Sequence, residues 1–430
     1  MNRAKLTAWL HQRTSLLLTN PQFLRLWAGL GISELGDWVG HTALTLLIYD
    51  VTGSASAMAT LTIVRSLPVL LFGPVAGVLA DRFSRRWIMI LSDIARSFLY
   101  ALIPFVTTSP QIMTIAFLTS CIAVFFDPAL MAIVPDLVEK DHLLEANSLQ
   151  LSTYNLMMIV GPAMGGLIVG FLGQAWAFWL NAATFLASAL AIFSIVEKWQ
   201  RRDAAQEKRG ARLWIKDMAQ GLGYIVRQRA VAVLTVEMMI MALSMVAVTV
   251  LEVIFIKDVL GAGNEGYGLL ISVAGIGALV GSLLAGWVGK KASSSALYCW
   301  TGLLVGLTFF LYANVRVFSL TLIIVLVQML IYSIGGVAGQ ALLQQLVPED
   351  LRGRVFSQIT TGYTITSIVG AALWGALIDR IGVIPAFNIA GVIATLAGLF
   401  LVANLSLLQK KETQSLTSAA VERPVAIESA

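Results

Sequence analysis

Apolar segments long enough to cross a lipid bilayer recur along almost the whole chain, and this feature constrains its fold more than any other. A spanning helix needs about 20 apolar residues. The chain is 58% hydrophobic and 12% charged, whereas soluble domains carry about 25% charged residues. We therefore expect an all-α membrane protein. Its twelve predicted transmembrane helices lie near residues 26–49, 56–80, 87–106, 111–133, 146–171, 175–196, 231–256, 266–289, 295–315, 318–343, 355–378 and 383–408.

Basic residues lie mostly on one side of these spans. Lys257, Arg316 and Arg380 fall in loops on one side, and Arg65 and Arg96 lie within spans. The remaining Lys and Arg residues lie in the termini or in loops on the other side, which the positive-inside rule assigns to the cytoplasm. We predict a multi-pass protein of the cell membrane with both termini cytoplasmic. The net charge of +5 follows from this bias, so membrane lipids suffice as a charged partner and no nucleic acid is expected.

The chain is internally duplicated. Tyr-Asp-Val-Thr-Gly at 49–53 recurs as Lys-Asp-Val-Leu-Gly at 257–261, and the segment 160–166 recurs at 369–375. Repeats in the same order, joined by one long hydrophilic segment, predict two pseudo-symmetric six-helix bundles. Within that segment, 212–229 is either an amphipathic surface helix or a solvated connector. The expected divisions are a cytoplasmic N-terminus at 1–25, bundles at 26–196 and 231–408, a cytoplasmic linker at 197–230 and a disordered cytoplasmic tail at 409–430.

Three motifs indicate a family. The loop at 77–86, Gly-Val-Leu-Ala-Asp-Arg-Phe-Ser-Arg-Arg, resembles the signature between the second and third helices of the major facilitator superfamily. Gly-Pro-Ala-Met-Gly-Gly at 161–166 resembles the fifth-helix motif of its exporters. Further details resemble the branch that contains macrolide efflux pumps and the enterobactin exporter: Ser33 to Asp37, Asp93 to Arg96, Pro135-Asp136 to Ala146-Asn147-Ser148, and Val347-Pro348 to Arg352-Gly353-Arg354. The resemblance extends from residues near 20 to 410 and implies the major facilitator fold.

The signature loop is a candidate conformational latch. Resemblance places the acid at Asp81 against the start of the eleventh helix, where a carboxylate gains roughly 0.3–1 kcal/mol from the helix dipole. Such a contact can hold the outward-open state and break as the two halves rock; the alternative is a topology anchor. The other residues of the loop are Gly77, Arg82, Arg85 and Arg86, and its arginines either pair with nearby acids or keep the loop in the cytoplasm.

A second part of the latch is expected inside the membrane. Asp93 and Arg96 share a face of the third helix, and Asp127 of the fourth helix should lie at a similar depth. Ionised groups at such a depth are rare and normally pair. We expect a network of these three residues with the Asp81 loop, against the alternative of a static structural clamp.

The first helix carries the candidates for proton coupling. Glu34, Asp37 and His41 are spaced i, i+3, i+7, which places them on one face. Carboxylates and a histidine that face the bundle can take up and release protons. Arg65 of the second helix is the expected counter-ion, and the alternative is a permanent pair between Arg65 and one of the acids.

The remaining candidates concern packing and the substrate. Gly161, Pro162, Gly165 and Gly166 form a small-residue face with a proline kink, which allows either rocking without a leak or ordinary helix packing. In the second half, Glu237 of the seventh helix is a candidate gate, substrate contact or surface acid. The other polar candidates in that apolar wall are Gln328 and Gln340.

The sequence predicts a secondary active transporter rather than an enzyme. It contains no phosphate-binding loop and no metal-ligand spacing of Cys and His, so no cofactor and no metal are expected. An asymmetric, largely apolar cavity suits a small organic molecule that is amphipathic or hydrophobic, and resemblance implies export of a drug, macrolide or siderophore, with proton antiport and alternating access in a monomer. The alternatives are a lipid or lysophospholipid translocator on the same fold and a non-transporting membrane sensor or scaffold.

Overall fold

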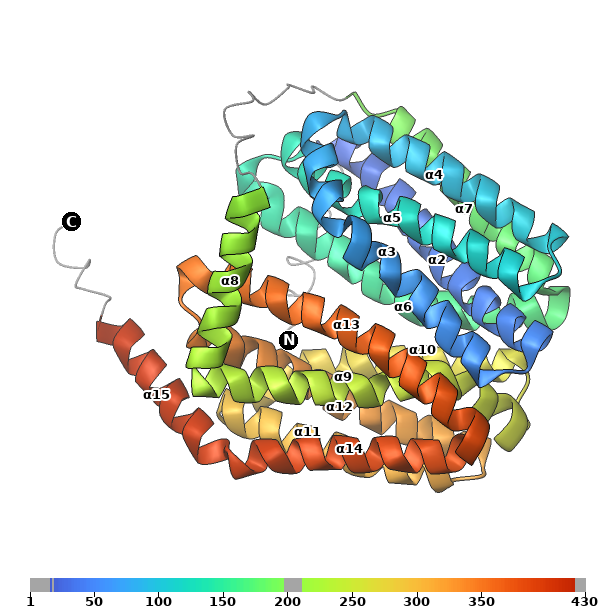
Figure 1. Ribbon diagram of the computed structural model, residues 1–430. Helices are drawn as coiled ribbons and strands as arrows, with labels where there is room; N and C mark the ends of the chain where they lie inside the picture. The colour runs from blue at the N-terminus through green and yellow to red at the C-terminus, as the bar shows by residue number, and fades with distance from the viewer. Residues whose placement is uncertain (1–15, 18, 197–210, 422–430) are drawn as a thin grey trace, which may run out of the picture. The chain divides into compact units, whose positions relative to one another are not determined.

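The computed structural model describes residues 16–17, 19–196 and 211–421, and all secondary structure in these residues is helical (Figure 1). They form two compact units. The first contains Met1–Gln206 and Ile256–Ser272, and the second contains Glu207–Phe255 and Val273–Ala430. The segment Ile256–Ser272 therefore belongs to the first unit, although the chain on both sides of it belongs to the second.

Six long helices make up most of the first unit, and short 3-10 turns follow two of them. The helices are α2 (Pro21–Thr52), α3 (Ala55–Arg82), α4 (Arg85–Leu102), α5 (Ser109–Leu137), α6 (Leu143–Leu172) and α7 (Gln174–Phe193), with turns η1 (Ile103–Phe105) and η2 (Lys140–His142).

The rest of the described chain is also helical. Its elements are α8 (Ala211–Arg227), α9 (Arg229–Ile254), the π-helical turn η4 (Phe255–Val259), α10 (Asn264–Val288), α11 (Ser294–Asn314), α12 (Phe318–Leu346), α13 (Glu349–Ile381), α14 (Val383–Ala403) and α15 (Leu405–Val421). The end of η4 and the start of α10 belong to the first unit.

Eleven helices among the described residues are long and apolar enough to cross a membrane, and each coincides with a predicted span. The first predicted span corresponds to α2, which is a continuous helix of 32 residues but is not among the eleven. Glu34, Asp37 and His41 account for this, because they lower the mean hydropathy of its middle. The predicted span that is not among the eleven is thus the one that carries the predicted coupling residues.

Local side chains fix where the first helices begin and end. Asn20 accepts a hydrogen bond from the Phe23 amide, and Gly53 ends α2 in the left-handed region at φ 57°. Ser84 accepts from the Trp87 amide at the start of α4, directly after the end of α3. These caps satisfy amides and carbonyls that a helix end leaves unpaired. They leave only a two-residue turn in the signature loop.

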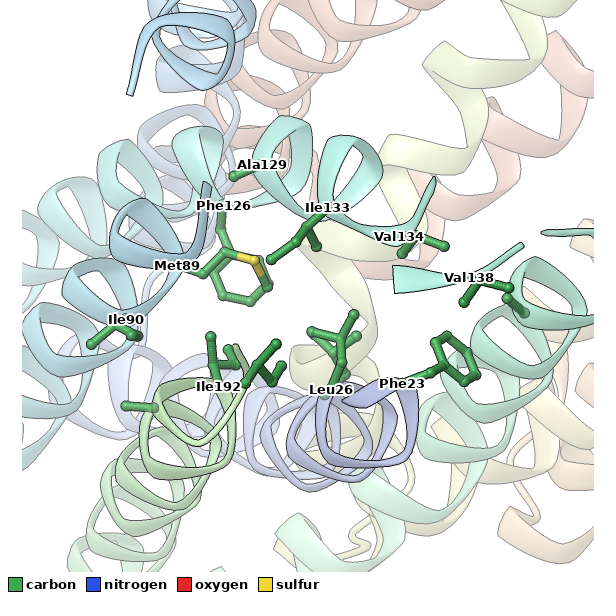
Figure 2. Close-up of a cluster of buried hydrophobic side chains, with 14 of the residues drawn as sticks. Phe23, Leu26, Met89, Ile90, Phe126, Ala129, Ile133, Val134, Val138 and Ile192 are labelled. Atoms are coloured by element: carbon green, nitrogen blue, oxygen red, sulfur yellow. The ribbon is translucent and has the colours of Figure 1, made fainter. Parts of the chain in front are cut away.

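The core of the first unit brings four helices together. Figure 2 shows Leu26 of α2, Met89 of α4, Phe126 and Ile133 of α5, and Ile192 of α7 gathered in one cluster. All five side chains are 0–6% exposed. Met89 lies one turn before Asp93 on α4, so this packing holds the helix that carries the predicted in-membrane network.

Helices α11 and α14 of the second unit approach each other so closely that they require glycine. A Cβ atom at Gly306 would lie 2.5 Å from the backbone nitrogen of Thr395. One at Gly398 would lie 2.4 Å from the Cα atom of Leu303. Because these neighbours are backbone atoms, they cannot rotate away as a side chain would.

Gly398→Val is therefore expected to destabilise the second unit by about 1–3 kcal/mol, the usual cost of overpacking. Thermal unfolding of the purified chain in detergent measures it as a lowered midpoint. Gly286→Val is the matched control, because an added Cβ at Gly286 of α10 meets nothing within 4 Å. Equal midpoints for the two variants would contradict the close-packing account.

The polar tail, predicted to be disordered, is helical over Leu405–Val421. The Glu412 carboxylate explains this difference, since it is 5% exposed and accepts hydrogen bonds from the backbone amides of Ser294 and Ser295 at 2.9 and 3.1 Å. It therefore caps the start of α11, where a negative charge is favoured by the helix dipole. The end of the predicted tail, 422–430, lies outside the described residues.

The predicted linker is helical over Ala211–Arg227, and its first part, 197–210, lies outside the described residues. The helix α8 packs on α13 within the second unit: Arg354 donates to the Gln220 side chain at 2.7 Å. Tyr224 donates to the backbone carbonyl of Leu346 at 2.9 Å. The predicted N-terminal segment 1–25 is described only at residues 16–17 and from 19 onward.

Candidate functional site

Arg96 of α4 is the centre of a charged cluster inside the first unit. Its Nη2 atom donates to Asp93 Oδ1 at 2.6 Å, and its Nη1 atom lies 3.4 Å from Asp37 Oδ2. The guanidinium also lies over the rings of Phe126 and Phe185, with Cζ 4.8 and 4.3 Å from their centroids. One arginine therefore links α4 to α2, α5 and α7.

The two acids beside Arg96 differ in their access to the surroundings. Asp93 is fully buried, whereas 43% of the Asp37 side chain is exposed. The contact from Arg96 to Asp37 is also the longer of the two. Asp37 is therefore the more exposed of the two partners and the one in the longer contact with Arg96.

The other predicted charged residues lie around this cluster without a recorded ion pair among the described residues. Glu34 Oε2 and Arg65 Nη1 are both buried without a hydrogen-bond partner in the part of the chain that the structure describes. Asp127 is exposed. The His41 ring lies tilted against the Trp38 ring, with ring centroids 5.8 Å apart. The structure thus pairs Asp37 with Arg96, where the sequence suggested Arg65, and so joins the predicted coupling group to the predicted latch.

Two glycines of α2, next to this cluster, let α7 pack closely on α2. A Cβ atom at Gly36 would lie 1.9 Å from Thr184 Oγ1, and one at Gly40 would lie 2.3 Å from Asn181 Nδ2. Asn181 and Thr184 are buried polar residues, 0% and 8% exposed. Sequence analysis did not identify them as site residues. The spacing of two small residues four apart on a polar helix is the signal that could have indicated this close approach.

In the signature loop, the arginines tie helix ends together within the first unit. Arg85 forms an ion pair with Asp136 and donates to the Ala132 carbonyl at 2.8 Å, which joins the start of α4 to the end of α5. Arg86 donates to the carbonyls of Phe193 and Ile192 at the end of α7. The Asp81 side chain, central to the predicted latch, lies outside the described residues. An added Cβ at Gly77 meets nothing within 4 Å.

The predicted exporter motif packs on two sides. A Cβ atom at Gly161 would lie 2.4 Å from the Trp38 Cβ atom of α2. At Gly166 it would lie 2.8 Å from the Cα atom of Gly268 in α10, and at Gly268 it would lie 2.4 Å from the Pro162 carbonyl oxygen. Gly165 of the motif also faces α2, because an added Cβ there would lie 3.1 Å from the Val39 carbonyl oxygen. The motif therefore joins α6 both to the helix with the coupling candidates and to the start of α10.

A polar cluster at the end of α2 consists of the two copies of the internal repeat. Asp50 forms an ion pair with Lys257 and accepts a hydrogen bond from Gln174 at 2.6 Å. Tyr49 donates a hydrogen bond to Asp258. The first residue of each copy therefore contacts the second residue of the other, as in a two-fold symmetric interface. The repeat is visible in the sequence, but this contact is not. Lys257 and Asp258 both lie in the π-helical turn η4.

In the second unit, Glu237 of α9 lines a cavity of about 180 Å³. Glu237 is 1% exposed and accepts a hydrogen bond from the Tyr298 hydroxyl. The two predicted glutamines do not line this cavity: Gln328 is buried within α12, and Gln340 is exposed. The cavity residues that could not be assigned from the sequence include three aromatic ones: Tyr298, Tyr332 and Tyr363.

Comparison with known proteins identifies the class to which this fold and site belong. The chain matches the transmembrane secretion effector family over residues 15–429 and belongs to it. It is therefore a membrane transporter of the major facilitator superfamily and not an enzyme.

Relatives in sequence include proteins that are named for efflux. The chain is 30% identical to the uncharacterized transporter YfiS of Bacillus subtilis, over 89% of this chain and 92% of that one. It is 25% identical to macrolide efflux protein A of Streptococcus pyogenes, over 86% and 92%. A bacterial homologue of the lysosomal transporter Spinster, solved in an inward-facing and unoccupied conformation, has the same fold, with a TM-score of 0.69 at 13% identity over 92% and 98%.

Proposed function

We propose that this transporter exports a small organic molecule, amphipathic or hydrophobic, by proton antiport through alternating access. The observation that carries the proposal is the contact between Arg96 and the half-exposed Asp37 of α2. Charged groups within a membrane are costly and mark ion or substrate pathways. The efflux activity in the name of the streptococcal relative supports the direction of transport.

The geometry suggests how a proton would act. Protonation of Asp37 removes the negative charge that attracts Arg96 Nη1, while the shorter contact from Nη2 to the buried Asp93 remains. The contact between Arg96 and Asp37, which links α4 to α2, then weakens. The contact between Arg96 and Asp93, which lies within α4, does not. Glu34 lies one turn before Asp37 on α2, so the proton can pass between neighbouring carboxylates. Substrate export and proton entry would alternate at this pair.

The remaining motif residues would carry the movement. Asp81, Arg82, Arg85 and Arg86 form the proposed cytoplasmic latch, and Gly77 belongs to the same signature. Gly161 and Gly165 of α6 pack on α2, so a movement of α2, which carries Asp37, would also move α6. We place both termini in the cytoplasm, from the distribution of basic residues, and take the monomer as the working unit.

Accumulation of labelled compounds in cells tests the export function. Cells that express the chain should retain less of at least one amphipathic drug or siderophore than cells that express Asp37→Asn at the same membrane level. Vesicles that contain the purified chain and a labelled lysophospholipid form the second arm. Flux of the lipid without flux of any soluble compound would instead support a lipid translocator, and the absence of both would support a sensor or scaffold.

A further inference from the structure

The cavity in the second unit lies between four helices of that unit. Glu237, Met238, Met239 and Met241 come from α9, and the three tyrosines come from α11, α12 and α13. Gly302, Gly335 and Gly336 provide the room between them. The lining is therefore apolar and aromatic with a single carboxylate.

Glu237 is an acid without a cation. It is 1% exposed, and no ion pair joins it to any residue that the structure describes. Its only recorded hydrogen bond comes from Tyr298 to Oε2. Oε1 lies toward Gly302, where an added Cβ would be 3.7 Å away. A buried carboxylate without a positive partner is costly, so this site is completed by a bound proton or a bound cation.

The walls select the kind of cation. Tyrosine rings attract a cation through the negative faces of their π-systems, and methionine thioethers adapt to apolar groups of irregular shape. Small inorganic ions prefer several charged or carbonyl oxygen ligands, whereas Glu237 supplies the one carboxylate of this lining and the other side-chain oxygens are hydroxyls. The volume of about 180 Å³ exceeds that of a water, roughly 30 Å³, several times over. The cavity therefore fits an organic group.

We propose that this cavity binds the charged group of a hydrophobic organic cation, with Glu237 as the counter-ion and the three tyrosines as the surrounding wall. Tyr298 holds the carboxylate through Oε2, and Oε1 is left to face the ligand. The ligand's role as exported substrate rests on the proposed function, but its binding does not.

Equilibrium binding of radiolabelled tetraphenylphosphonium to the purified chain in detergent tests the site. We expect saturable binding that the neutral triphenylphosphine oxide competes with weakly. Glu237→Gln should reduce the affinity about tenfold or more, as expected when a buried ionic partner is removed. Tyr363→Leu should reduce it about twofold to fivefold, through loss of one aromatic face.

Two further variants keep the test decisive. Glu252→Gln removes another buried acid of the same helix, 7% exposed and outside the cavity lining, and should bind normally. Gly336→Leu leaves Glu237 intact and adds a bulky side chain to the cavity lining, where an added Cβ at Gly336 meets nothing within 4 Å and the replacement needs no repacking; it should weaken binding even if Glu237→Gln does not fold. Unchanged binding in Glu237→Gln or in Gly336→Leu would overturn the proposal. So would a loss of affinity in Glu252→Gln equal to that in Glu237→Gln.

The outcome is separable from that of the proposed function. Binding through Glu237 without proton-driven transport would leave this site standing and remove proton antiport. Proton-driven export that persists in Glu237→Gln, with tetraphenylphosphonium bound equally well, would leave antiport standing and remove this site.

Discussion

Arg96→Met is expected to destabilise the first unit by about 3–5 kcal/mol, the cost of removing one partner from a buried ion pair. Methionine keeps an apolar contact with Phe126 and Phe185 but leaves the fully buried Asp93 without a cation. Denaturant unfolding of the purified chain, followed by tryptophan fluorescence, measures the change. Substitution of Asp37 should cost less, because that side chain is partly exposed.

A double variant tests the cause of that loss. Asp93→Asn combined with Arg96→Met should recover most of the stability, because a neutral amide needs no positive partner. Asp37→Asn alone should cost far less than Arg96→Met. If the double variant is no more stable than Arg96→Met, the buried pair does not account for the effect and Arg96 acts through its packing on the two rings.

Asp37→Asn and Glu34→Gln are each expected to abolish the release of protons when substrate binds. Both replacements preserve the shape of the side chain and remove its ability to carry a proton. Addition of a transported compound to the chain in unbuffered detergent solution should lower the pH for the wild type and leave it unchanged for both variants. Substrate binding itself should persist in both variants.

The matched control lies on the same helix. Asp50→Asn changes an acid at the other end of α2, where Asp50 pairs with Lys257 and Gln174, and should release protons normally. A normal pH response in both Asp37→Asn and Glu34→Gln would remove these acids as proton carriers. A lost response in Asp50→Asn as well would mean that any disturbance of α2 blocks the measurement.

The membrane helices could be predicted because a spanning segment is defined by its own length and composition. Eleven predicted spans coincide with helices of spanning length and hydropathy. Helix α15 could not be predicted, because it depends on a contact between Glu412 and the start of α11 more than a hundred residues away in sequence. The polar composition of that tail gave no indication of a partner.

Within the site, the same distinction between local and distant contacts applies. Helix periodicity alone predicts the contact between Asp93 and Arg96, and the structure contains it. The contact from Arg96 to Asp37 depends on how α2 and α4 pack, which periodicity does not determine. Three tyrosines from three separate helices line one cavity with Glu237 for the same reason. Only the tertiary arrangement brings these groups to one place.

Uphill transport in vesicles tests proton antiport most directly. The purified chain is reconstituted into vesicles with an acidic interior, and the accumulation of radiolabelled tetraphenylphosphonium is followed at zero membrane potential. This probe has no titratable proton, so a pH difference cannot accumulate it without a carrier. Antiport predicts accumulation above the external concentration that nigericin abolishes and Asp37→Asn lacks. Flux of the probe only to the equilibrium level, equal with and without the pH gradient, would contradict it.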